Sequence, residues 1–336
     1  MIVPARNEAA GILETLQSLV NQSYPRHLFE IIVIDDHSTD ATPDLVQSLN
    51  NPQIKFFHLR EYLQGQQANA YKKLALGLGI QKAKGELIVT TDADCLAPTN
   101  WLLLIASYYE KNPCKFIAAP VNFFQEKNLL EKFQSLDFMG MMLLTGAGIR
   151  TGLFHMCNGA NLAYPKQVFE EVNGFQGIDH LASGDDLLLL HKIAARYPGE
   201  IGFIKNVEAT VCTQAKATWT SFLQQRLRWA TKSSSYQEWQ LTFILAMVFF
   251  LCVGIVVSGV ASFFLSWSFF MCFLILFLLK SLADYFFLNR AAHFFQRDDL
   301  MSAFWVAQFL HIFYIVVIGI WSNLVKQYEW KGRKVR

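Results

Sequence analysis

The stretch Phe29-Glu30-Ile31-Ile32-Val33-Ile34-Asp35-Asp36 decides the fold class of this chain. Its run from 29 to 34 is largely apolar and is closed at once by two acidic residues, as is typical of a strand buried on both faces of a parallel sheet. A second such run, 86–91, is closed by Asp92-Ala93-Asp94. Residues 2–3 form a strand remnant that ends at Pro4.

Between these runs lie stretches with helical periodicity. The sequence predicts strands at 2–3, 29–34, 54–59 and 86–91, and helices at 10–21, 41–49 and 70–82. Strand–helix alternation predicts an α/β fold with a parallel sheet and helices on both faces. Ligands of such sheets bind beyond the carboxyl ends of the strands, so the acidic strand ends should face one crevice.

Residues 100–235 are less regular. They predict a glycine-rich loop at 140–152, a turn-rich segment at 157–161 and an acidic loop at 184–186. The stretch from Trp219 to Lys232 is amphipathic and basic, and it predicts a helix that lies on a membrane surface.

The C-terminal part is strongly apolar. From Leu241 to Leu279 the sequence holds no Asp, Glu, Lys, Arg or His, which is enough for about two membrane-spanning helices of roughly 20 residues each. A third apolar run, 300–325, is interrupted only by His311. We therefore expect four parts: a catalytic domain at 1–218, an interfacial segment at 219–240, about three transmembrane or membrane-embedded helices at 241–325, and a basic tail at 326–336.

Charge is distributed unevenly along the chain. The formal net charge of +2 predicts no bulk attraction to nucleic acid. Basic residues instead flank the apolar region, a pattern that suits anionic lipid headgroups. They are Arg226, Arg228 and Lys232 before it, and Lys326, Lys331, Arg333, Lys334 and Arg336 after it.

The six cysteines show no zinc-ligand spacing, which favours reduced or buried thiols in a cytosolic domain. The first strand has almost no residues before it, so we expect the chain to be clipped at its start.

Asp92 and Asp94 are the first candidates for chemistry. Two carboxylates one residue apart at the start of a loop can both reach one hard cation, and Mg²⁺ or Mn²⁺ prefers one or two carboxylates together with substrate phosphates. A metal bound there would offset charge on a departing diphosphate. The alternative is a solvated turn that contains two acids.

Two further acidic clusters are ambiguous in the same way. Asp36 could bind a base or ribose hydroxyl, or it could cap the helix at 41–49 together with Asp40. A carboxylate of Asp185 or Asp186 could take a proton from an acceptor hydroxyl. The alternative is that these two acids cap the helix that follows and complement its dipole.

The fourth constellation is Gln225-Arg226-Leu227-Arg228-Trp229. An arginine can clamp phosphate oxygens in a bidentate fork, and a tryptophan can stack on a sugar or a base. The alternative is a membrane-interface anchor, since both residue types favour that boundary.

The order and spacing of these motifs resemble the family 2 glycosyltransferases, the GT-A enzymes related to cellulose, chitin and hyaluronan synthases and to ceramide glucosyltransferase. The matching motifs are Val3 to Glu8, Asp35-Asp36, Asp92-Ala93-Asp94, Gly184-Asp185-Asp186 and Gln225-x-x-Arg228-Trp229. Asn158 to Asn161 and Trp330 to Arg333 are similar to features of membrane-bound members. The resemblance covers essentially the whole of the sequence before the apolar region.

The resemblance implies a GT-A, Rossmann-like nucleotide-sugar-binding domain with C-terminal transmembrane helices, and it implies roles for individual residues. The nucleotide would be held by Pro4, Ala5, Arg6, Asn7, Glu8 and Asp36, with Lys72 near the diphosphate. Asp92 and Asp94 would serve the metal and the donor. Asn158, Gly159 and Asn161 would line the acceptor side, and Gln225, Arg228 and Trp229 would close over donor and acceptor.

The implied reaction is a single in-line displacement that inverts the anomeric centre. Asp186 matches the catalytic base of the family. Asp185 stands where a glutamate is usual, so either acid could be the base. His37 stands where a glycine is usual, which bears on the geometry of that turn. The expected donor is a nucleotide-diphosphate sugar, with UDP as the family default, and the expected acceptor is a lipid or a glycan.

Other classes of protein fit less well. A transporter would leave the first 240 residues unexplained, and the one charged pair expected inside a span, Lys280 with Asp284 near its end, suits mutual pairing. An inactive sugar-binding homologue would not need the intact acids. Within the enzyme class, a processive polysaccharide synthase remains the alternative to single transfer.

The membrane topology is left open by the sequence. With the catalytic domain inside, three full spans would place the basic tail outside, against the positive-inside rule. Either the tail breaks this rule or the third apolar segment does not fully cross.

Overall fold

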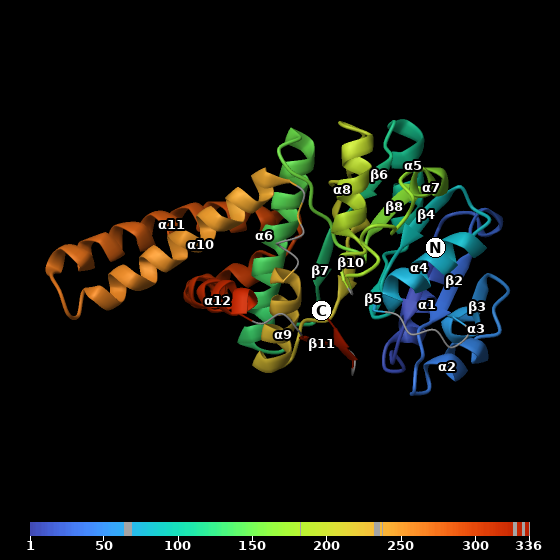
Figure 1. Ribbon diagram of the computed structural model, residues 1–336, viewed down its shortest axis with the longest axis horizontal. Helices are drawn as coiled ribbons and strands as arrows, with labels where there is room; N and C mark the ends of the chain where they lie inside the picture. The colour runs from blue at the N-terminus through green and yellow to red at the C-terminus, as the bar shows by residue number, and fades with distance from the viewer. Residues whose placement is uncertain are drawn as a thin grey trace. The chain divides into compact units, whose positions relative to one another are not determined.

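The computed structural model divides the chain into two compact units (Figure 1). It describes residues 1–63, 69–181, 183–231, 236 and 238–324, together with the backbone of 328–330 and 333–335. The first unit comprises Met1–Asn122, Thr145–Gln214 and Glu329–Arg336, and the second comprises Phe123–Leu144 and Ala215–Tyr328. A single boundary at 218 does not describe this division, because residues 123–144 belong to the same unit as the C-terminal helices.

The first unit is built on a mixed sheet, seven-stranded within the described residues, in the order β3-β2-β1-β4-β8-β6-β9. Its strands are β1 (Ile2–Ala5), β2 (Ile31–Asp35), β3 (Ile54–His58), β4 (Leu87–Thr90), β6 (Phe116–Ala118), β8 (Leu162–Pro165) and β9 (Ile201–Phe203). β1, β2, β3 and β4 are parallel, as the strand–helix alternation predicted.

The strand β8 lies beyond the stretch whose alternation predicted parallel strands, and it runs antiparallel to both β4 and β6. The register pairs Thr90, the last residue of β4, with Leu162, the first residue of β8. The turn at 157–161 therefore lies at the carboxyl end of β4, and β8 runs from there in the opposite direction along that strand.

The sheet is covered on both faces. Successive side chains of a strand point to opposite faces, and every residue of β2 is buried, as are Ile2 and Val3 of β1. Helix α4 (Tyr71–Lys82) packs on β1 and β2. A β-carbon at Gly79 would lie 2.6 Å from Cγ2 of Ile2, so glycine is what lets this helix approach the sheet.

The helices predicted at 10–21, 41–49 and 70–82 correspond to α1 (Ile12–Val20), α2 (Thr42–Ser48) and α4, and they agree to within two residues at each end. The other elements of this unit are η1 (Arg26–Leu28), α3 (Leu59–Leu63), β5 (Cys95–Leu96), α5 (Trp101–Lys111), β7 (Val121–Phe123), α7 (Lys166–Glu171), α8 (Leu187–Arg196), η2 (Val207–Ala209) and β10 (Val211–Thr213). β5, β10 and β7 form a second, three-stranded sheet, in which β5 is antiparallel to β10.

The prediction of a glycine-rich loop at 140–152 is wrong. Nearly all of this stretch is the second half of a long helix, α6 (Leu129–Thr151). Its glycines serve close packing. A β-carbon at Gly140 would lie 2.8 Å from Cδ2 of Leu288, and one at Gly148 would lie 2.5 Å from the ring of Phe154. Neighbouring side chains fill the space that a larger residue would need, and this outweighs the low helix propensity of glycine.

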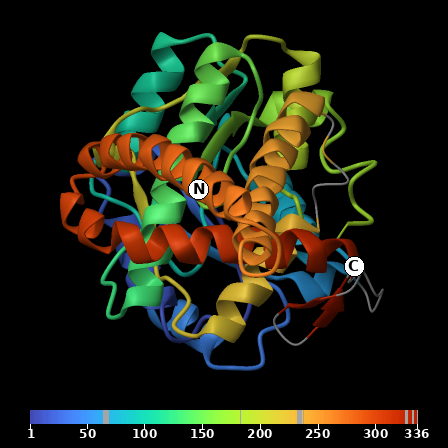
Figure 2. The ribbon, with the colours of Figure 1, turned by 90° about the vertical axis from the view of Figure 1, so that its left-hand side faces the viewer.

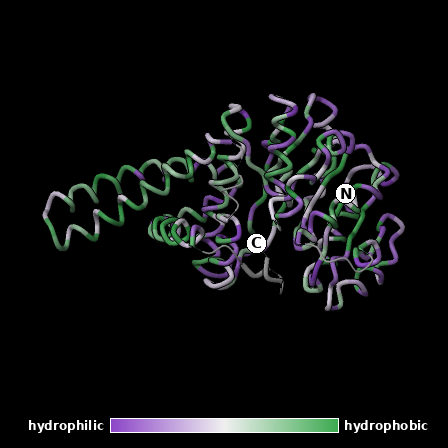
Figure 3. Tube along the Cα trace, in the orientation of Figure 1, coloured by the Kyte–Doolittle hydropathy of each residue, from purple (hydrophilic) through white to green (hydrophobic). Residues whose placement is uncertain are grey.

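The second unit contains α9 (Trp219–Ala230), α10 (Trp239–Ala261), α11 (Trp267–Phe294), η4 (Asp298–Ala303) and α12 (Phe304–Leu324). Three segments among the described residues are long and apolar enough to cross a membrane, namely 239–261, 267–294 and 298–324. Their hydropathy is plain in Figure 3. Figure 1 shows α10 and α11 side by side as a long hairpin, and Figure 2 shows α12 along its length.

Two expectations about charge in this region need correction. Lys280 and Asp284 form the expected ion pair, but α11 extends to Phe294, so the pair lies in the middle of the helix rather than near a span end. Arg226 does not face lipid headgroups, since its side chain is buried and pairs with Asp137.

The rest of the basic flank is only partly described. Lys232, Lys326, Lys331 and Arg336 lie outside the described residues, and so does Gly332. The backbone of the tail forms two short paired strands, β11 (Tyr328–Trp330) and β12 (Arg333–Val335).

Candidate active site

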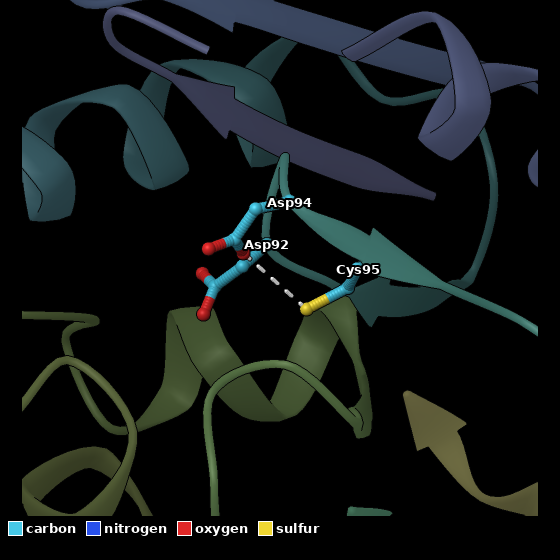
Figure 4. A group of neighbouring side chains, drawn as sticks. All are labelled: Asp92, Asp94 and Cys95. Atoms are coloured by element: carbon cyan, nitrogen blue, oxygen red, sulfur yellow. Dashed lines mark hydrogen bonds between the residues drawn. The ribbon is translucent and has the colours of Figure 1, made fainter. Parts of the chain in front are cut away.

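The loop that carries Asp92 and Asp94 joins β4 to β5 at the carboxyl edge of the sheet. Its middle residue, Ala93, is buried, and its carbonyl accepts a hydrogen bond of 3.0 Å from Oγ1 of Thr15. This anchor turns both carboxylates out of the sheet, with Asp94 exposed and Asp92 half-buried. Figure 4 shows the two carboxylates beside the thiol of Cys95.

These side chains fit a hard divalent cation. One oxygen of each carboxylate and Sγ of Cys95 all lie within 4.8 Å of one another. Burial and the adjacent acids Asp94 and Asp92 raise the pKa of the Cys95 thiol well above its usual value. Because a protonated thiol is a poor ligand for Mg²⁺ or Mn²⁺, the two carboxylates are the groups in this cluster that suit such an ion.

Lys72 connects this loop to the second acidic cluster. Its Nζ lies 2.7 Å from Oδ1 of Asp92 and 3.2 Å from Oδ2 of Asp185. Burial alone would lower the pKa of Lys72, but Asp185 and Asp92 more than compensate and raise it well above its usual range. Lys72 is therefore a permanent cation placed between two carboxylates, near the position where the resemblance expects the diphosphate.

Asp185 and Asp186 lie where the chain enters α8. Gly184 precedes them with a φ of 83°, in the left-handed region that glycine tolerates best. Oδ1 of Asp186 accepts a hydrogen bond of 2.7 Å from the N–H of Leu187, and Oδ2 accepts one of 3.1 Å from the N–H of Gly159. Asp186 thus caps α8, the role that the sequence offered as the alternative, and the cap also fixes its carboxylate in the site.

Gly159 lies at the centre of the cluster. A β-carbon there would be 3.5 Å from Nζ of Lys72, 3.5 Å from Oδ2 of Asp186 and 3.6 Å from Oδ2 of Asp185. Its carbonyl also accepts a 3.2 Å hydrogen bond from Oγ1 of Thr90, the last residue of β4. The turn at 157–161 therefore brings the acids of 92–94 and 184–186 into one place.

The two asparagines of this turn differ in position. Oδ1 of Asn158 accepts a 3.0 Å hydrogen bond from the N–H of Ala160, and its side chain is half-buried at the site. Asn161 is completely buried, which corrects its expected place on the acceptor side. Its Nδ2 donates to the carbonyls of Pro120 and Ala209, and its Oδ1 accepts from Nε1 of Trp101.

The N-terminal motif is tied to the loop that follows β2. Pro4 and Ala5 end β1, and Nη1 of Arg6 donates to the carbonyls of Asp36 and His37, at 2.8 and 2.9 Å. The backbone of Asn7 and Glu8 is tied to the loop after β2 through hydroxyls. The N–H of Asn7 donates to Ser38 Oγ, and that of Glu8 donates to Thr42 Oγ1.

The backbone conformation at His37 explains why a glycine is usual at this position. Its φ is 55°, so the residue occupies the left-handed region that glycine enters without cost. Nδ1 of His37 lies 2.9 Å from Oδ1 of Asp36. The imidazole packs edge-on against the ring of Tyr71, with 5.3 Å between the two ring centres. The turn therefore keeps the expected geometry, with an imidazole added beside Asp36.

The other acids of this edge have local partners. Asp35 is buried, with Oδ1 accepting from the N–H of Ser38 and Oδ2 lying 3.2 Å from Nδ1 of His58. Asp40 accepts from the N–H of Thr42 and of Ala9, so it fixes the start of α2. Asp36 is also buried and has the imidazole of His37 as a partner.

Three neighbours of the site were missed by reasoning from the sequence: Tyr71, Thr90 and Cys95. Tyr71 begins α4 directly before Lys72, and Cys95 directly follows Asp94. Their adjacency to predicted site residues was the available signal.

Gln225, Arg228 and Trp229 belong to α9 in the second unit, which is described by itself. The ring of Trp229 packs against Phe138 at 5.9 Å, and the guanidinium of Arg226 lies 4.4 Å from its centre. Oε1 of Gln225 is buried and has no hydrogen-bond partner within the described part of the chain. A buried acceptor of this kind is costly unless a ligand supplies a donor.

Comparison with known proteins identifies the family of this chain. The model of "Glycosyl transferase family 2" matches residues 1–172, and that of "Glycosyl transferase family group 2" matches 87–288. Two curated relatives are similar over most of this chain. A probable glycosyltransferase, YdaM, of Bacillus subtilis is 28% identical over 243 residues, which is 68% of this chain and 54% of the relative.

The second relative is a beta-monoglucosyldiacylglycerol synthase of Nostoc sp., 28% identical over 247 residues, or 71% of this chain and 49% of the relative. The chain thus spans about half the length of the curated relatives it matches.

A similar solved structure is the mannosyltransferase PcManGT of Pyrobaculum calidifontis, in complex with GDP-Man and Mn²⁺. It has a TM-score of 0.52 at 21% identity and covers 96% of this chain and 86% of its own, a likeness that shows the fold. Since the first family model covers about half of the chain, with β1 to β8 and the acidic loop at 92–94, and the other continues through 184–186 into the apolar helices, the chain belongs to glycosyl transferase family 2.

Proposed function

We propose that this protein transfers a sugar from a nucleotide-diphosphate sugar to a lipid or another membrane-proximal acceptor, with inversion at the anomeric carbon. The carrying observation is the convergence of Asp92, Lys72, Asp185 and Asp186 around Gly159 at the carboxyl edge of the sheet. Two carboxylate groups separated by a permanent cation suit a reaction in which an anionic diphosphate departs on one side and an acceptor hydroxyl loses its proton on the other.

The donor would be held in two places. The loop formed by Pro4, Ala5, Arg6, Asn7 and Glu8, together with Asp36, would bind the nucleoside. Lys72 and the pair Asp92 and Asp94 would bind the diphosphate. A Mg²⁺ or Mn²⁺ ion held by Asp92 and Asp94 would supply Lewis-acid stabilisation of the leaving diphosphate.

The acceptor would enter beside the turn at 157–161, lined by Asn158 and Gly159. Asp186 would remove the proton of the acceptor hydroxyl, whose oxygen forms a bond to the anomeric carbon while the bond from that carbon to the diphosphate breaks. Asp185 is the alternative base, although its ion pair with Lys72 makes its carboxylate less available. Gln225, Arg228 and Trp229 would close over donor and acceptor.

A lipid acceptor is supported by the apolar helices. The second unit contains three segments able to cross a membrane by length and composition, and such helices keep the protein where lipid acceptors are. A curated relative is, by its name, a synthase of a glucosyldiacylglycerol. Since the donors are cytoplasmic metabolites, the catalytic unit would face the cytoplasm, in keeping with the basic residues that flank the apolar region.

The test is a donor screen on the purified full chain in detergent. UDP- and GDP-sugars are offered with a lipid extract and Mn²⁺, and both the released nucleoside diphosphate and the glycosylated product are measured. Transfer of one sugar to a lipid supports the proposal, whereas chains of many sugars would identify a polysaccharide synthase. Release of nucleoside diphosphate with none of the donors would reject the proposed reaction.

A further inference from the structure

Lys73, the residue after Lys72 on α4, is buried and bound to the loop that leads to Asp185. Its side chain is only 2% exposed, although it is a lysine. Nζ donates to the carbonyl of Leu181 at 2.5 Å and to the carbonyl of Ser183 at 2.8 Å. Lysine is almost never fully buried unless it is paired, so these two bonds are a specific contact rather than a chance one.

The loop that precedes α8 has little regular structure of its own. Between α7, which ends at Glu171, and α8, which begins at Leu187, the described residues form turns and bends without a helix or strand. Gly177 and Gly184 have φ values of 85° and 83°, in the left-handed region that interrupts regular structure. Connecting segments are the more mobile parts of a protein, so a carboxylate on this loop keeps its position only where the rest of the fold holds the backbone.

Two lysines bind the backbone of this loop at its two ends. Lys73 binds the end nearest the acids, and Nζ of Lys192, on α8, donates to the carbonyls of Gly174 and Gln176 at 2.6 and 2.8 Å. An ammonium group has three donors and no acceptor, so one lysine can bind two carbonyls at once. Such charge-assisted bonds are stronger than those of neutral donors. The two contacts are alike in chemistry, but Gln176 lies nine positions before Asp185.

Neighbouring residues of α4 therefore bind the acidic loop in two places. Nζ of Lys72 lies 3.2 Å from the carboxylate of Asp185, and Nζ of Lys73 lies 2.8 Å from the carbonyl of Ser183, two positions earlier. α4 itself packs on β1 and on β2, whose residues are all buried. The position of the acids relative to the sheet is thus set through α4, with Lys73 holding the backbone and Lys72 holding a carboxylate.

We infer that Lys73 is a positioning residue for sugar transfer. Its bonds to the carbonyls of Leu181 and Ser183 hold the loop so that the carboxylate of Asp186 stands where it removes the proton of the acceptor. This inference rests on the proposed function. Lys73 acts through the backbone that it binds and does not itself contact donor or acceptor. Its loss displaces the base, and a displacement of about 1 Å at a reacting group can cost about 10²-fold in rate.

Hydrogen exchange on the full chain in detergent tests the holding role without any measurement of activity. Lys73→Met keeps the length of the side chain and removes its donors, so the backbone amides of 183–190 should exchange severalfold faster than in the parent. Within this range the N–H of Leu187 bonds to Asp186 and that of Leu188 to the carbonyl of Gly184, so both report on the loop.

Lys192→Met is the matched control for hydrogen exchange, because it removes the same kind of contact at the other end of the loop. It should increase exchange near 174–178 and leave the amides of 183–190 close to the parent. Unchanged exchange at 183–190 in Lys73→Met would overturn the inference, whether or not the protein transfers a sugar.

Lys73→Arg is the variant that should restore the contact. It keeps the charge and several N–H donors, and Lys73 lines a cavity of about 750 Å³ together with Gly77 and Phe169, which leaves room for the larger head group. Lys73→Gln, which keeps a neutral donor, takes the place of Lys73→Met if that variant does not fold, and it should show a smaller loss of the same kind.

Kinetic measurements on the folded variants separate positioning from stability. Lys73→Met should lower kcat by about 10- to 10²-fold and leave donor KM within a fewfold of the parent. Lys73→Arg should recover most of the rate, and Lys192→Met should keep the parent kcat. Parent-like kcat in Lys73→Met with only a lower unfolding temperature would overturn the inference, and so would a Lys73→Arg variant no faster than Lys73→Met. Absence of turnover in the parent would instead reject the proposed function, and hydrogen exchange would still decide whether Lys73 holds the acids.

Discussion

Nζ of Lys72 lies 2.7 Å from Oδ1 of Asp92, which places a cation against one of the two carboxylates expected to hold a metal. The same ammonium group is 3.2 Å from Asp185 on the other side. Lys72 therefore competes with a divalent ion for Asp92 and at the same time prevents the two acidic clusters from repelling each other.

Lys72→Met should separate these two effects. We expect apparent Mn²⁺ affinity to rise severalfold, because the competing cation is gone, while turnover falls by about 10²-fold or more through the lost stabilisation of the diphosphate. Titration of Mn²⁺ against nucleotide release measures both quantities. Lys72→Arg keeps the charge and should be less impaired. A parent-like rate in Lys72→Met would remove Lys72 from the proposed donor site.

Asp94→Ala should abolish metal-dependent turnover and leave the fold intact, because the side chain is exposed at the end of a rigid loop. The matched control is Cys95→Ser in the same cluster. Since the raised pKa of Cys95 keeps the thiol protonated, its loss should change the rate only a fewfold. If excess Mg²⁺ or Mn²⁺ gave Asp94→Ala a rate near that of the parent, the metal assignment would be wrong.

Asp186→Asn should lower kcat by about 10²–10⁴-fold with little effect on donor KM, as removal of a general base does. Asparagine is also a good N-cap, so the start of α8 should survive and the unfolding temperature should change little. Asp185→Asn is the comparison, and it should act mainly through the lost partner of Lys72. A large loss of kcat in Asp185→Asn together with a small one in Asp186→Asn would exchange the two roles.

Those parts of the fold that depend on local interactions could be predicted from the sequence, and those that depend on distant contacts could not. β1 to β4, with the acids that close β2 and β4, were predictable because apolar runs and strand-end acids are local signals, and the family match confirms the fold. The antiparallel β8 was not, since its direction depends on where the turn at 157–161 lies in space. The helix at 129–151 was obscured by glycines whose purpose is contact with remote side chains such as Leu288.

The candidate site shows the same limit. The order of the motifs indicated which residues belong to the candidate site. The structure brings four of them together, namely Lys72, Asp92, Asp185 and Asp186. Asn161 could not be placed correctly, because a buried asparagine and a ligand-binding one look alike until their partners are known. The role of Arg226 depends on Asp137, 89 positions earlier along the printed sequence, so no local pattern could reveal it.

Asn161→Ala should be a stability variant. It would leave Nε1 of Trp101 and the carbonyl of Ala209 without their Asn161 partner in a fully buried place, at a cost of about 1–3 kcal/mol for each unsatisfied group. The carbonyl of Pro120 would lose one bond and keep the one from the N–H of Val211. We expect a clear drop in unfolding temperature in detergent. Asn158→Ala is the matched control, because it loses one local bond and should unfold near the parent temperature. Equal thermal stability of both variants would contradict the assignment.

The last prediction concerns Arg228 and Trp229, which the sequence offers either as closure of the active site or as a membrane anchor. Trp229 packs on Phe138 and under the guanidinium of Arg226, so its ring is held within the second unit rather than presented to lipid. A mere anchor would tolerate Trp229→Phe and Arg228→Lys, since apolar and cationic character are kept. A residue that closes over substrate would not, because phenylalanine lacks the indole N–H and lysine lacks the planar fork.

We therefore expect Trp229→Phe and Arg228→Lys each to reduce transfer at least 10-fold without changing sedimentation with membranes. Trp219→Phe, on the same helix and 47% exposed, is the control and should leave transfer near the parent rate. Turnover and membrane partition are measured on the same preparations. Parent-like turnover with weakened membrane binding in both variants would make this motif an anchor, and the proposed closure over donor and acceptor would then need other residues.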